Sequence, residues 1–231
     1  MNPLPLVMLP GMMCDARLFA PQIDSLSRDR AVMVAPIHLG ERVEDVASSI
    51  LDMTPHRFAL AGLSMGGIVA LEIIRRAPDR VARLALIDTN ALAETPEKAA
   101  AREPQIVGVK AGRMRDIMRD EMKPNYLANG PYKNEILSMV MDMAETLGPE
   151  AFIRQSRALQ RRRDQQSTLR KIKCPTLVMC GAEDTLCPPK RHEFMAEMIE
   201  GAVLHIVAGA GHLPTLEQPQ TTNAILRQWL A

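Results

Sequence analysis

The sequence contains few aromatic residues for its length. Phenylalanine, tyrosine and tryptophan together make up 3% of the 231 residues, whereas 16 residues are methionine. We therefore expect an apolar pocket in this chain to be lined by aliphatic side chains and by methionine, which adapts to flexible ligands.

Cysteine pairs of the kind that bind metals are also missing. The four cysteines, Cys14, Cys174, Cys180 and Cys187, form no CxxC motif, and no histidine cluster accompanies them at the spacing of a zinc site. We interpret them as small buried thiols in a reducing cytosol and expect neither a metal site nor a cofactor.

Long apolar runs and an excess of one charge are absent too. No stretch approaches the ~20 apolar residues of a membrane span. The first residues, MNPLPLVMLPG, are too short an apolar run, too rich in proline and too poor in basic residues for a signal peptide. The formal net charge of +1 favours neither nucleic acid nor an anionic membrane as a partner. We expect a cytoplasmic protein that acts on a small molecule.

The most informative stretch of the chain is 58–77, FALAGLSMGGIVALEIIRRA. A short apolar run leads into Gly62-Leu63-Ser64-Met65-Gly66-Gly67, and a pattern with helical spacing follows. A serine between a strand and a helix, flanked by glycines, is typical of a nucleophile elbow. The glycines permit the strained, closely packed turn, and the backbone N–H of Met65 at the helix start can donate to a developing oxyanion.

Apolar runs and helical patterns alternate along the rest of the chain, which predicts a doubly wound, mostly parallel sheet of about six strands with helices on both faces. We expect strands over 4–9, 31–37, 58–61, 80–90, 175–180 and 202–207, and helices over 16–26, 43–53, 190–200 and 216–230, besides the helix after the elbow.

Residues 91–173 have a different texture from the flanking sequence. Charged, methionine-bearing helical segments are predicted over 97–102, 106–122, 133–147 and 149–163, with breaks at Pro104, Pro124, Gly130-Pro131 and Gly148-Pro149. We predict a helical cap over 91–173, inserted into a core formed by 1–90 and 174–231.

Four cap methionines could line an acyl pocket, although their spacing is more typical of core positions: Met114, Met118, Met139 and Met143. The run Arg161-Arg162-Arg163 could indicate an anionic partner, but a solvated helix end is the favoured interpretation.

Three chemically active side chains are expected in loops at the carboxyl edge of the sheet, where such loops converge. Ser64, Asp184 and His212 follow the chain order expected after a nucleophile elbow. His212 would take the proton of the Ser64 hydroxyl, and Asp184 would orient the imidazole. The loop after the first strand makes the backbone N–H of Met12 our candidate for a second oxyanion donor, beside that of Met65.

Other residues compete for two of these roles. Asp88 also follows a strand and could be the acid, although the Gly-x-x-Asp sequence before Pro188-Pro189 favours Asp184. The remaining histidines are placed less well than His212: His38 in a loop, His56 at the opposite edge of the sheet, His192 in a helix and His205 within a strand.

With these motifs the chain resembles the α/β-hydrolase superfamily over nearly its whole length. The resemblance is carried by Leu9-Pro10-Gly11-Met12, by the elbow, by Gly181-Ala182-Glu183-Asp184 and by Gly211-His212. It implies a serine hydrolase with a helical cap and is specific for fold and catalytic apparatus, not for substrate. Two features depart from the superfamily: no hairpin precedes the first strand, and Pro10-Gly11 stands where His-Gly is frequent. The serine at the elbow argues against dehalogenase and epoxide hydrolase chemistry.

The leading hypothesis is hydrolysis of a small carboxylic ester or thioester. Three alternatives stay open: cleavage of a carbon–carbon bond or an enol-lactone by the same three residues, acyl transfer to an alcohol, and ligand binding or signalling on a hydrolase fold. The oligomeric state is not predicted by the sequence.

Overall fold

The computed structural model describes residues 3–122 and 126–231, and these contain a six-stranded sheet in the order β2-β1-β3-β4-β5-β6. All neighbouring strands are parallel, as predicted. The strands are β1 Leu6–Leu9, β2 Val32–Val34, β3 Phe58–Leu63, β4 Val81–Ile87, β5 Thr176–Gly181 and β6 Val203–Val207.

Burial differs between the central and the edge strands. Every residue of β1, β3 and β5 is buried, which matches their continuous apolar sequences because helices cover both faces of the sheet. Strand β2 has only β1 as a neighbour and is half-buried throughout. This explains why the strand expected over 31–37 is reduced to three residues.

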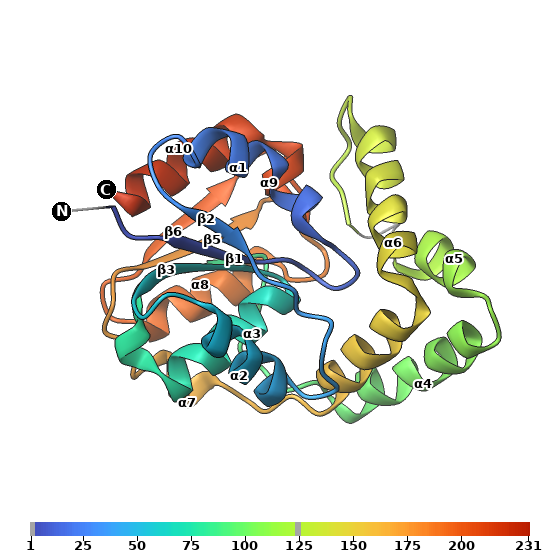
Figure 1. The fold of residues 1–231 in the computed structure, drawn as a ribbon. Coiled ribbons are helices and arrows are strands. Elements are labelled where there is room, and N and C mark those ends of the chain that lie inside the picture. The colour runs from blue at the N-terminus through green and yellow to red at the C-terminus, as the bar shows by residue number, and fades with distance from the viewer. Residues whose placement is uncertain (1–2, 123–125) are drawn as a thin grey trace.

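Helices cover the two faces of the sheet, as expected for a doubly wound fold (Figure 1). On one face, α1 (Ala20–Leu26) packs against α10 (Pro219–Leu230), and on the other α2 (Val43–Met53) packs against α3 (Met65–Arg76), with α8 (Pro189–Met198) beside β5. The shorter elements are η1 (Ala16–Phe19), η2 (Pro78–Arg80), α7 (Gln166–Leu169) and α9 (Pro214–Glu217).

Two predicted helices are divided in the structure. The segment 16–26 begins as the 3-10 helix η1, where the Asp15 side chain accepts the N–H of Arg17. The segment 216–230 is split into α9 and α10 at Gln218, because Pro219 cannot donate a backbone hydrogen bond and starts a new helix.

The predicted helical insertion lies between β4 and β5 and stands to one side of the sheet (Figure 1). It consists of α4 (Pro96–Lys110), α5 (Met114–Ile117), the π-helix η3 (Met118–Met122) and α6 (Lys133–Gln160). The exact division into a core of 1–90 and 174–231 and a cap of 91–173 stays a prediction.

The predicted break at Pro104 is wrong, because this proline lies inside α4. Pro104 and Ala100, which lies one helical turn earlier, are both exposed. The Ala100 carbonyl receives no hydrogen bond from Pro104, which has no N–H, and can be hydrated instead. Helix α4 ends near Gly112, which has a φ of +83°. Such a left-handed residue is a common helix stop.

The other predicted breaks have different outcomes. Gly130-Pro131 precedes α6, as expected, and Gly148 marks a kink inside α6 with φ 79° and ψ 175°. The two segments predicted over 133–147 and 149–163 are therefore the two arms of one kinked helix. The predicted break at Pro124 lies outside the described residues.

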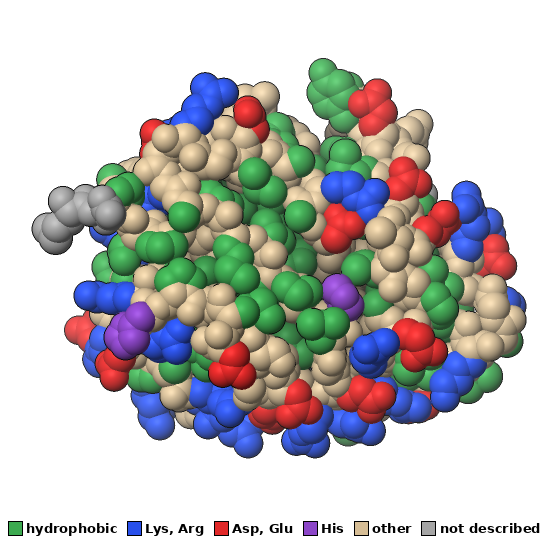
Figure 2. Space-filling view, viewed as in Figure 1, with side chains coloured by type: hydrophobic (Ala, Val, Ile, Leu, Met, Phe, Trp, Pro, Cys, Tyr) green, Lys and Arg blue, Asp and Glu red, His purple; other side chains and the backbone are tan. Residues whose placement is uncertain are grey.

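The four cap methionines are packed in the core. Met118 and Met143 are fully buried, and Met114 and Met139 are partly buried against the same cluster. Figure 2 shows charged side chains of both signs distributed over the cap and the lower rim of this face. None of the described helices is long and apolar enough to cross a bilayer.

Candidate active site

Ser64 occupies the sharp turn between β3 and α3. Its backbone has φ 55° and ψ −115°, a conformation that side-chain-bearing residues rarely adopt. The turn is held by a hydrogen bond from the Ser64 N–H to the Ile87 carbonyl (2.9 Å) and by another from the Thr89 hydroxyl to the Ser64 carbonyl (2.7 Å). The predicted strained elbow is therefore present.

The glycines around Ser64 are needed because backbone passes so close to them. A Cβ atom on Gly66 would lie 2.0 Å from the Leu9 carbonyl oxygen, and one on Gly62 would lie 2.3 Å from the Gly66 carbonyl oxygen. The start of α3 therefore packs directly against the end of β1. The loop after β1 lies next to Ser64 as a result.

The structure brings Ser64, His212 and Asp184 into one hydrogen-bonded chain. His212 Nε2 lies 2.9 Å from Ser64 Oγ, and His212 Nδ1 lies 2.8 Å from Asp184 Oδ2. Asp184 and His212 are buried, whereas Ser64 is half-buried and faces a cavity. This is the arrangement that a serine nucleophile, a general base and an orienting carboxylate require.

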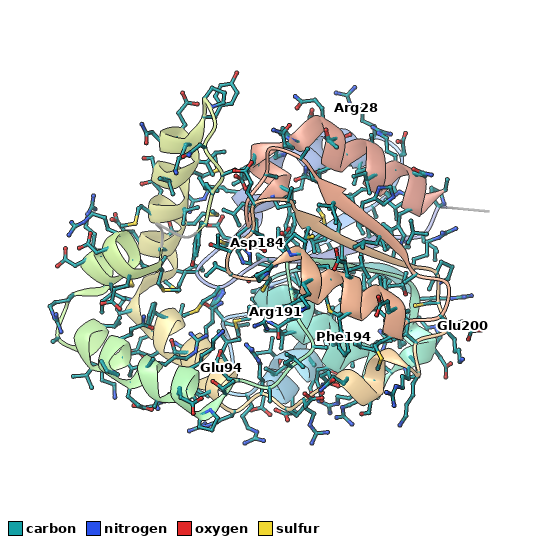
Figure 3. All side chains as sticks on the ribbon, turned by 180° about the vertical axis from the view of Figure 1, so that it is seen from behind. Arg28, Glu94, Asp184, Arg191, Phe194 and Glu200 are labelled. Carbon is teal, nitrogen blue, oxygen red and sulfur yellow. The ribbon has the colours of Figure 1, made fainter. Side chains whose placement is uncertain are left out.

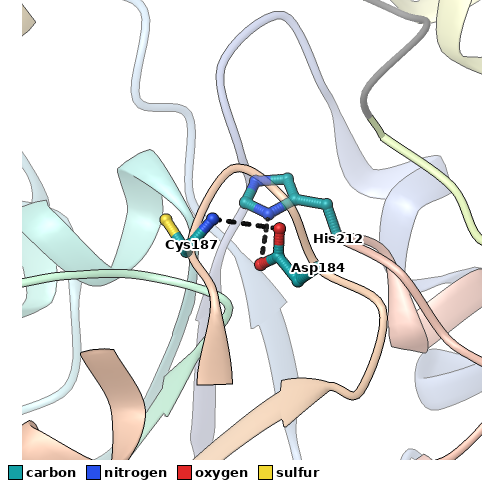
Figure 4. Close-up of side chains that lie close together, drawn as sticks. All are labelled: Asp184, Cys187 and His212. Carbon is teal, nitrogen blue, oxygen red and sulfur yellow. Dashed lines mark hydrogen bonds and ion pairs between the residues drawn. The ribbon is translucent and has the colours of Figure 1, made fainter. Parts of the chain in front are cut away.

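Asp184 is held as a carboxylate by its surroundings. Its Oδ1 accepts the backbone N–H groups of Leu186 (2.8 Å) and Cys187 (3.0 Å), and Figure 4 shows Oδ2 facing His212. Burial acts to raise the pKa of Asp184, but hydrogen bonds and the charge of His212 outweigh it, and the net shift is downward.

Cys187 lies beside this pair, so three side chains with metal-ligating atoms come together (Figure 4). The donor set is poorly suited to a metal. Burial, followed by the charge of Asp184, raises the pKa of the Cys187 thiol to about 12, whereas metals bind the thiolate. Both Asp184 oxygens are already engaged by His212 and the Leu186–Cys187 backbone.

The two expected oxyanion donors adjoin the serine. A Cβ atom on Gly11 would lie 3.5 Å from Ser64 Cβ, so the loop carrying Met12 passes directly beside Ser64. Met12 and Met65 both line the same cavity as Ser64. Among residues 3–122 and 126–231, no acceptor engages the backbone N–H of either residue. Both donors are thus free to bind a ligand oxygen.

Gln155 supports the loop that carries Met12 and was not predicted from the sequence. Its Oε1 accepts the N–H of Met13 (2.9 Å), a residue with a φ of +56°, and its side chain is fully buried. Gln155 lies on α6, 142 residues away in sequence. No local sequence signal marks such a contact.

Glu217 was also missed, and it joins the insertion to the histidine loop. Its carboxylate accepts the N–H groups of Gly211 (3.0 Å), Leu213 (3.0 Å) and Ala128 (2.8 Å). The His212 N–H donates to the Tyr126 carbonyl over 2.6 Å. Residues on both sides of the cavity are therefore fixed relative to His212.

Asp88, the alternative acid, lies behind Asp184 and is fully buried, with a φ of +43°. Its Oδ1 accepts the Gly181 N–H (2.9 Å), whereas its Oδ2 is buried with no hydrogen-bond partner among the described residues. Burial, followed by the charge of Asp184, holds the pKa of Asp88 well above its usual range. Asp184, and not Asp88, is therefore the carboxylate that the structure places on the histidine.

Replacing Asp88 by asparagine should change how stability depends on pH. The pKa of Asp88 is higher in the folded protein than in the unfolded chain, where it is about 3.9. The stability that this difference contributes is present below the unfolded pKa and is lost as the pH rises toward the folded pKa. Asparagine does not titrate and accepts a positive φ. Urea unfolding at several pH values should show the variant gaining more than ~1 kcal/mol over wild type between about pH 4 and about pH 8.

Asp52→Asn makes the same change of side chain at an exposed position and provides the matched control. If Asp88→Asn and wild type lose stability in parallel as the pH rises, the fold does not raise the pKa of Asp88.

The other histidines occupy the positions expected of them. His192 is fully buried in α8, where Nε2 accepts the Thr89 N–H (2.9 Å) and burial lowers its pKa to about 4. His205 lies in β6 opposite Met179, and His56 is exposed before β3. Burial, with a smaller contribution from Arg154, lowers the pKa of His38. None of these four lines the cavity with Ser64 among the described residues.

The predictions for the cysteines and for the arginine run are each confirmed only in part. Cys14, Cys180 and Cys187 are buried free thiols, as predicted, whereas Cys174 is half-buried. The solvated helix end is confirmed for Arg161 and Arg163 but wrong for Arg162, whose side chain is only 9% exposed. Arg162 lies over Glu94 in the wall of the cavity.

A cavity of about 370 Å³ extends from Ser64 toward the insertion. Methionine and aliphatic side chains line it in part, as expected; the contributing methionines are Met12, Met65 and Met122, and the four cap methionines lie in the core as the favoured interpretation had it. Its volume suits a small organic molecule.

Comparison with known proteins agrees with this geometry. The model of the alpha/beta hydrolase family matches residues 6–225. The chain is 25% identical over 195 residues to a pimeloyl-[acyl-carrier protein] methyl ester esterase of Neisseria meningitidis, covering 81% of this chain and 75% of the relative. An esterase of the same description from Aromatoleum aromaticum is 29% identical over 199 residues, which cover 81% and 79% of the two chains.

Among solved structures, a thermophilic esterase from Thermogutta terrifontis, described with malate bound, superposes with a TM-score of 0.91. Its sequence is 28% identical, and the match covers 98% of this chain and 89% of the esterase. The likeness therefore extends over the sheet, the flanking helices and the insertion.

Proposed function

Because the chain belongs to the alpha/beta hydrolase family, we propose that it hydrolyses small carboxylic esters with Ser64 as nucleophile, His212 as base and Asp184 as orienting acid. The observation that carries the proposal is the hydrogen-bonded chain from Ser64 Oγ through His212 to Asp184, with distances of 2.9 and 2.8 Å. The esterase relatives support an ester as the substrate.

The first half of the reaction forms an acyl-enzyme. Ser64 Oγ attacks the ester carbonyl carbon while His212 Nε2 takes the hydroxyl proton. The carbonyl oxygen becomes an oxyanion, which the N–H groups of Met12 and Met65 bind; one such donor contributes roughly 3 kcal/mol to the transition state. His212 then returns the proton to the leaving alkoxide, and the alcohol departs.

The second half releases the acid. Water enters, His212 removes one of its protons, and the oxygen attacks the acyl carbon bound to Ser64. The tetrahedral intermediate collapses, Ser64 recovers its proton from His212, and the carboxylic acid leaves. Asp184 stabilises the imidazolium in both halves without taking the proton itself.

Turnover of activated and natural-type esters tests the proposal. Wild type should release p-nitrophenol from p-nitrophenyl acetate and butyrate, and it should also be assayed on methyl esters, since the relatives are methyl ester esterases. Products should be acid and alcohol in equal amounts with water as acceptor. Cleavage restricted to carbon–carbon bonds or enol-lactones, or transfer of the acyl group to an added alcohol in preference to water, would instead support the alternative chemistries.

A binding or signalling protein on this fold makes a different prediction. Such a protein would bind a ligand or partner with equal affinity after Ser64→Ala and would turn over no ester. Absence of turnover in wild type, together with no reaction at Ser64 with an activated phosphonate, would overturn the proposed function.

A further inference from the structure

Three arginines from separate elements meet in the wall of the cavity that holds Ser64. Arg102 lies on α4, Arg162 follows the end of α6 and Arg191 lies on α8. We refer to these three as the arginine cluster. Glu94, in the segment between β4 and α4, lies among them and lines the same cavity.

Glu94 is the internal counter-ion of the cluster. Its side chain is 4% exposed and accepts two hydrogen bonds from Arg102, from Nε over 2.5 Å and from Nη2 over 2.9 Å. Arg162 Nη1 lies 3.3 Å from Glu94 Oε1. Burial acts to raise the pKa of Glu94, but Arg102 and Arg162 outweigh it, so the group is a carboxylate.

One carboxylate does not neutralise three guanidinium groups. Arg102 donates two hydrogen bonds to Glu94, and Arg162 shares the same carboxylate and donates from Nε to the Leu92 carbonyl (3.0 Å). Arg191 is half-buried, and its side chain has no hydrogen bond or ion pair in the part of the chain that the structure describes. Burial, with repulsion from Arg102 and Arg191, lowers the pKa of Arg162 despite the nearby Glu94. The arginine cluster therefore carries an excess of positive charge.

The remaining charged groups along the cavity do not remove this excess. Lys98 and Glu121 are both exposed and opposite in charge, and Glu121 accepts a hydrogen bond from Gln105. Asp184 is engaged by His212. Figure 3 shows Arg191 between Asp184 and Glu94, on the side of the cavity where α8 faces the insertion. Arg191, a partly buried guanidinium group with no partner among the described residues, is costly unless a ligand completes it.

We propose that the cavity recognises an ester that also carries a carboxylate, held by Arg162 and Arg191 while the ester group lies at Ser64. This inference rests on the proposed function and names its substrate class. A planar carboxylate matches the paired donors of a guanidinium group, and such charge-assisted bonds are stronger than neutral ones. The pair of Arg102 and Glu94 serves as the support against which Arg162 is held.

Matched esters with and without the carboxylate test the inference. The acyl series pairs the p-nitrophenyl monoesters of adipic and suberic acid with p-nitrophenyl hexanoate and octanoate. The alcohol series pairs p-carboxyphenyl acetate with phenyl acetate. In at least one series we expect kcat/KM to be higher for the anionic ester by about 10- to 100-fold.

Arg191→Gln is the diagnostic variant, because Arg191 has no internal partner whose loss would disturb folding. The ratio of kcat/KM for the anionic ester to that for its neutral match should fall to within about threefold of unity. Arg161→Gln is the matched control, since Arg161 adjoins Arg162 in sequence but is exposed and paired with Glu41 on the surface. Its ratio should equal that of wild type.

Binding of a free dicarboxylate gives a readout that does not depend on turnover. Adipate and suberate should inhibit hydrolysis of the neutral esters competitively and raise the melting temperature of wild type, and Arg191→Gln should weaken both effects by about tenfold in concentration. Arg161→Gln should behave as wild type.

Several outcomes would overturn the inference. Equal kcat/KM within each pair in wild type, or an unchanged preference in Arg191→Gln, would show that the cluster does not select an anion. A stronger preference for a phosphonate-bearing ester than for the carboxylate would overturn the choice of carboxylate. Hydrolysis of the neutral esters in these cases leaves the proposed function standing, whereas loss of all ester turnover counts against the proposed function instead.

Discussion

Ser64→Ala should lower kcat for ester hydrolysis by about ten-thousandfold to a millionfold while the protein stays folded. In the proposed mechanism the hydroxyl oxygen forms the acyl bond, and no other hydroxyl is hydrogen-bonded to His212 in the described parts of the chain. Asp184→Asn should cost about ten-thousandfold, because the amide cannot hold the imidazole in the tautomer that accepts the serine proton.

Steady-state kinetics on p-nitrophenyl butyrate, with circular dichroism to verify folding, provides the measurement. Ser49→Ala is a suitable control, since Ser49 is exposed on α2 and bonds only to its own helix through the Asp45 carbonyl. Activity of Ser64→Ala within tenfold of wild type would rule out the covalent mechanism.

Gly66→Ala should have the largest effect on stability. The added Cβ would lie 2.0 Å from the Leu9 carbonyl oxygen and 2.7 Å from that of Pro10. Leu9 belongs to β1, which pairs with strands on both sides and cannot move without disturbing the sheet. We expect a loss of roughly 3 kcal/mol or more in the free energy of unfolding, or a protein that does not fold.

In any Gly66→Ala protein that does fold, Met12 should be displaced relative to Ser64, so kcat should fall as well. Gly130→Ala is the matched control, because a Cβ there meets nothing within 4 Å and Gly130 does not have a left-handed backbone. Its effect should stay within about 0.5 kcal/mol. Urea unfolding of both variants decides the matter, and equal stability of the two would contradict the close packing at the elbow.

The elbow and its partners were predictable because their signals are local. Ser64 has its glycines within three residues, and Asp184 and His212 each lie in the loop that follows a predicted strand. In a parallel sheet the ends of such strands meet at one edge, so three short patterns are enough to place three side chains together. The choice between Asp184 and Asp88 also followed from local sequence, and the structure places Asp184 within 2.8 Å of His212 Nδ1.

The support around the site was not predictable, because it depends on contacts across the chain. Gln155 reaches Met13 over 142 positions, and Glu217 joins Ala128 to the histidine loop. Arg162 was expected in solvent because a run of three arginines ends a helix. Only the packing of the insertion against Glu94 turns one of the three inward.

That the insertion is helical was easier to predict than where its helices are interrupted. Pro104 carries a strong breaking signal, yet its solvent-exposed position lets α4 continue. The spacing of the cap methionines could not distinguish pocket from core, and Met118 and Met143 proved to be fully buried. Burial and exposure, which decide such cases, are properties of the assembled fold.

The central claim is that Ser64 becomes covalently acylated during turnover. Wild type treated with a fluorophosphonate should gain one adduct, which peptide mass spectrometry should place on Ser64, and ester hydrolysis should be lost in proportion to labelling. Denaturing the protein first should prevent the reaction, because a serine without His212 beside it is a weak nucleophile. Full ester hydrolysis in protein that carries no label on Ser64, or labelling at another residue that abolishes activity, would contradict the account.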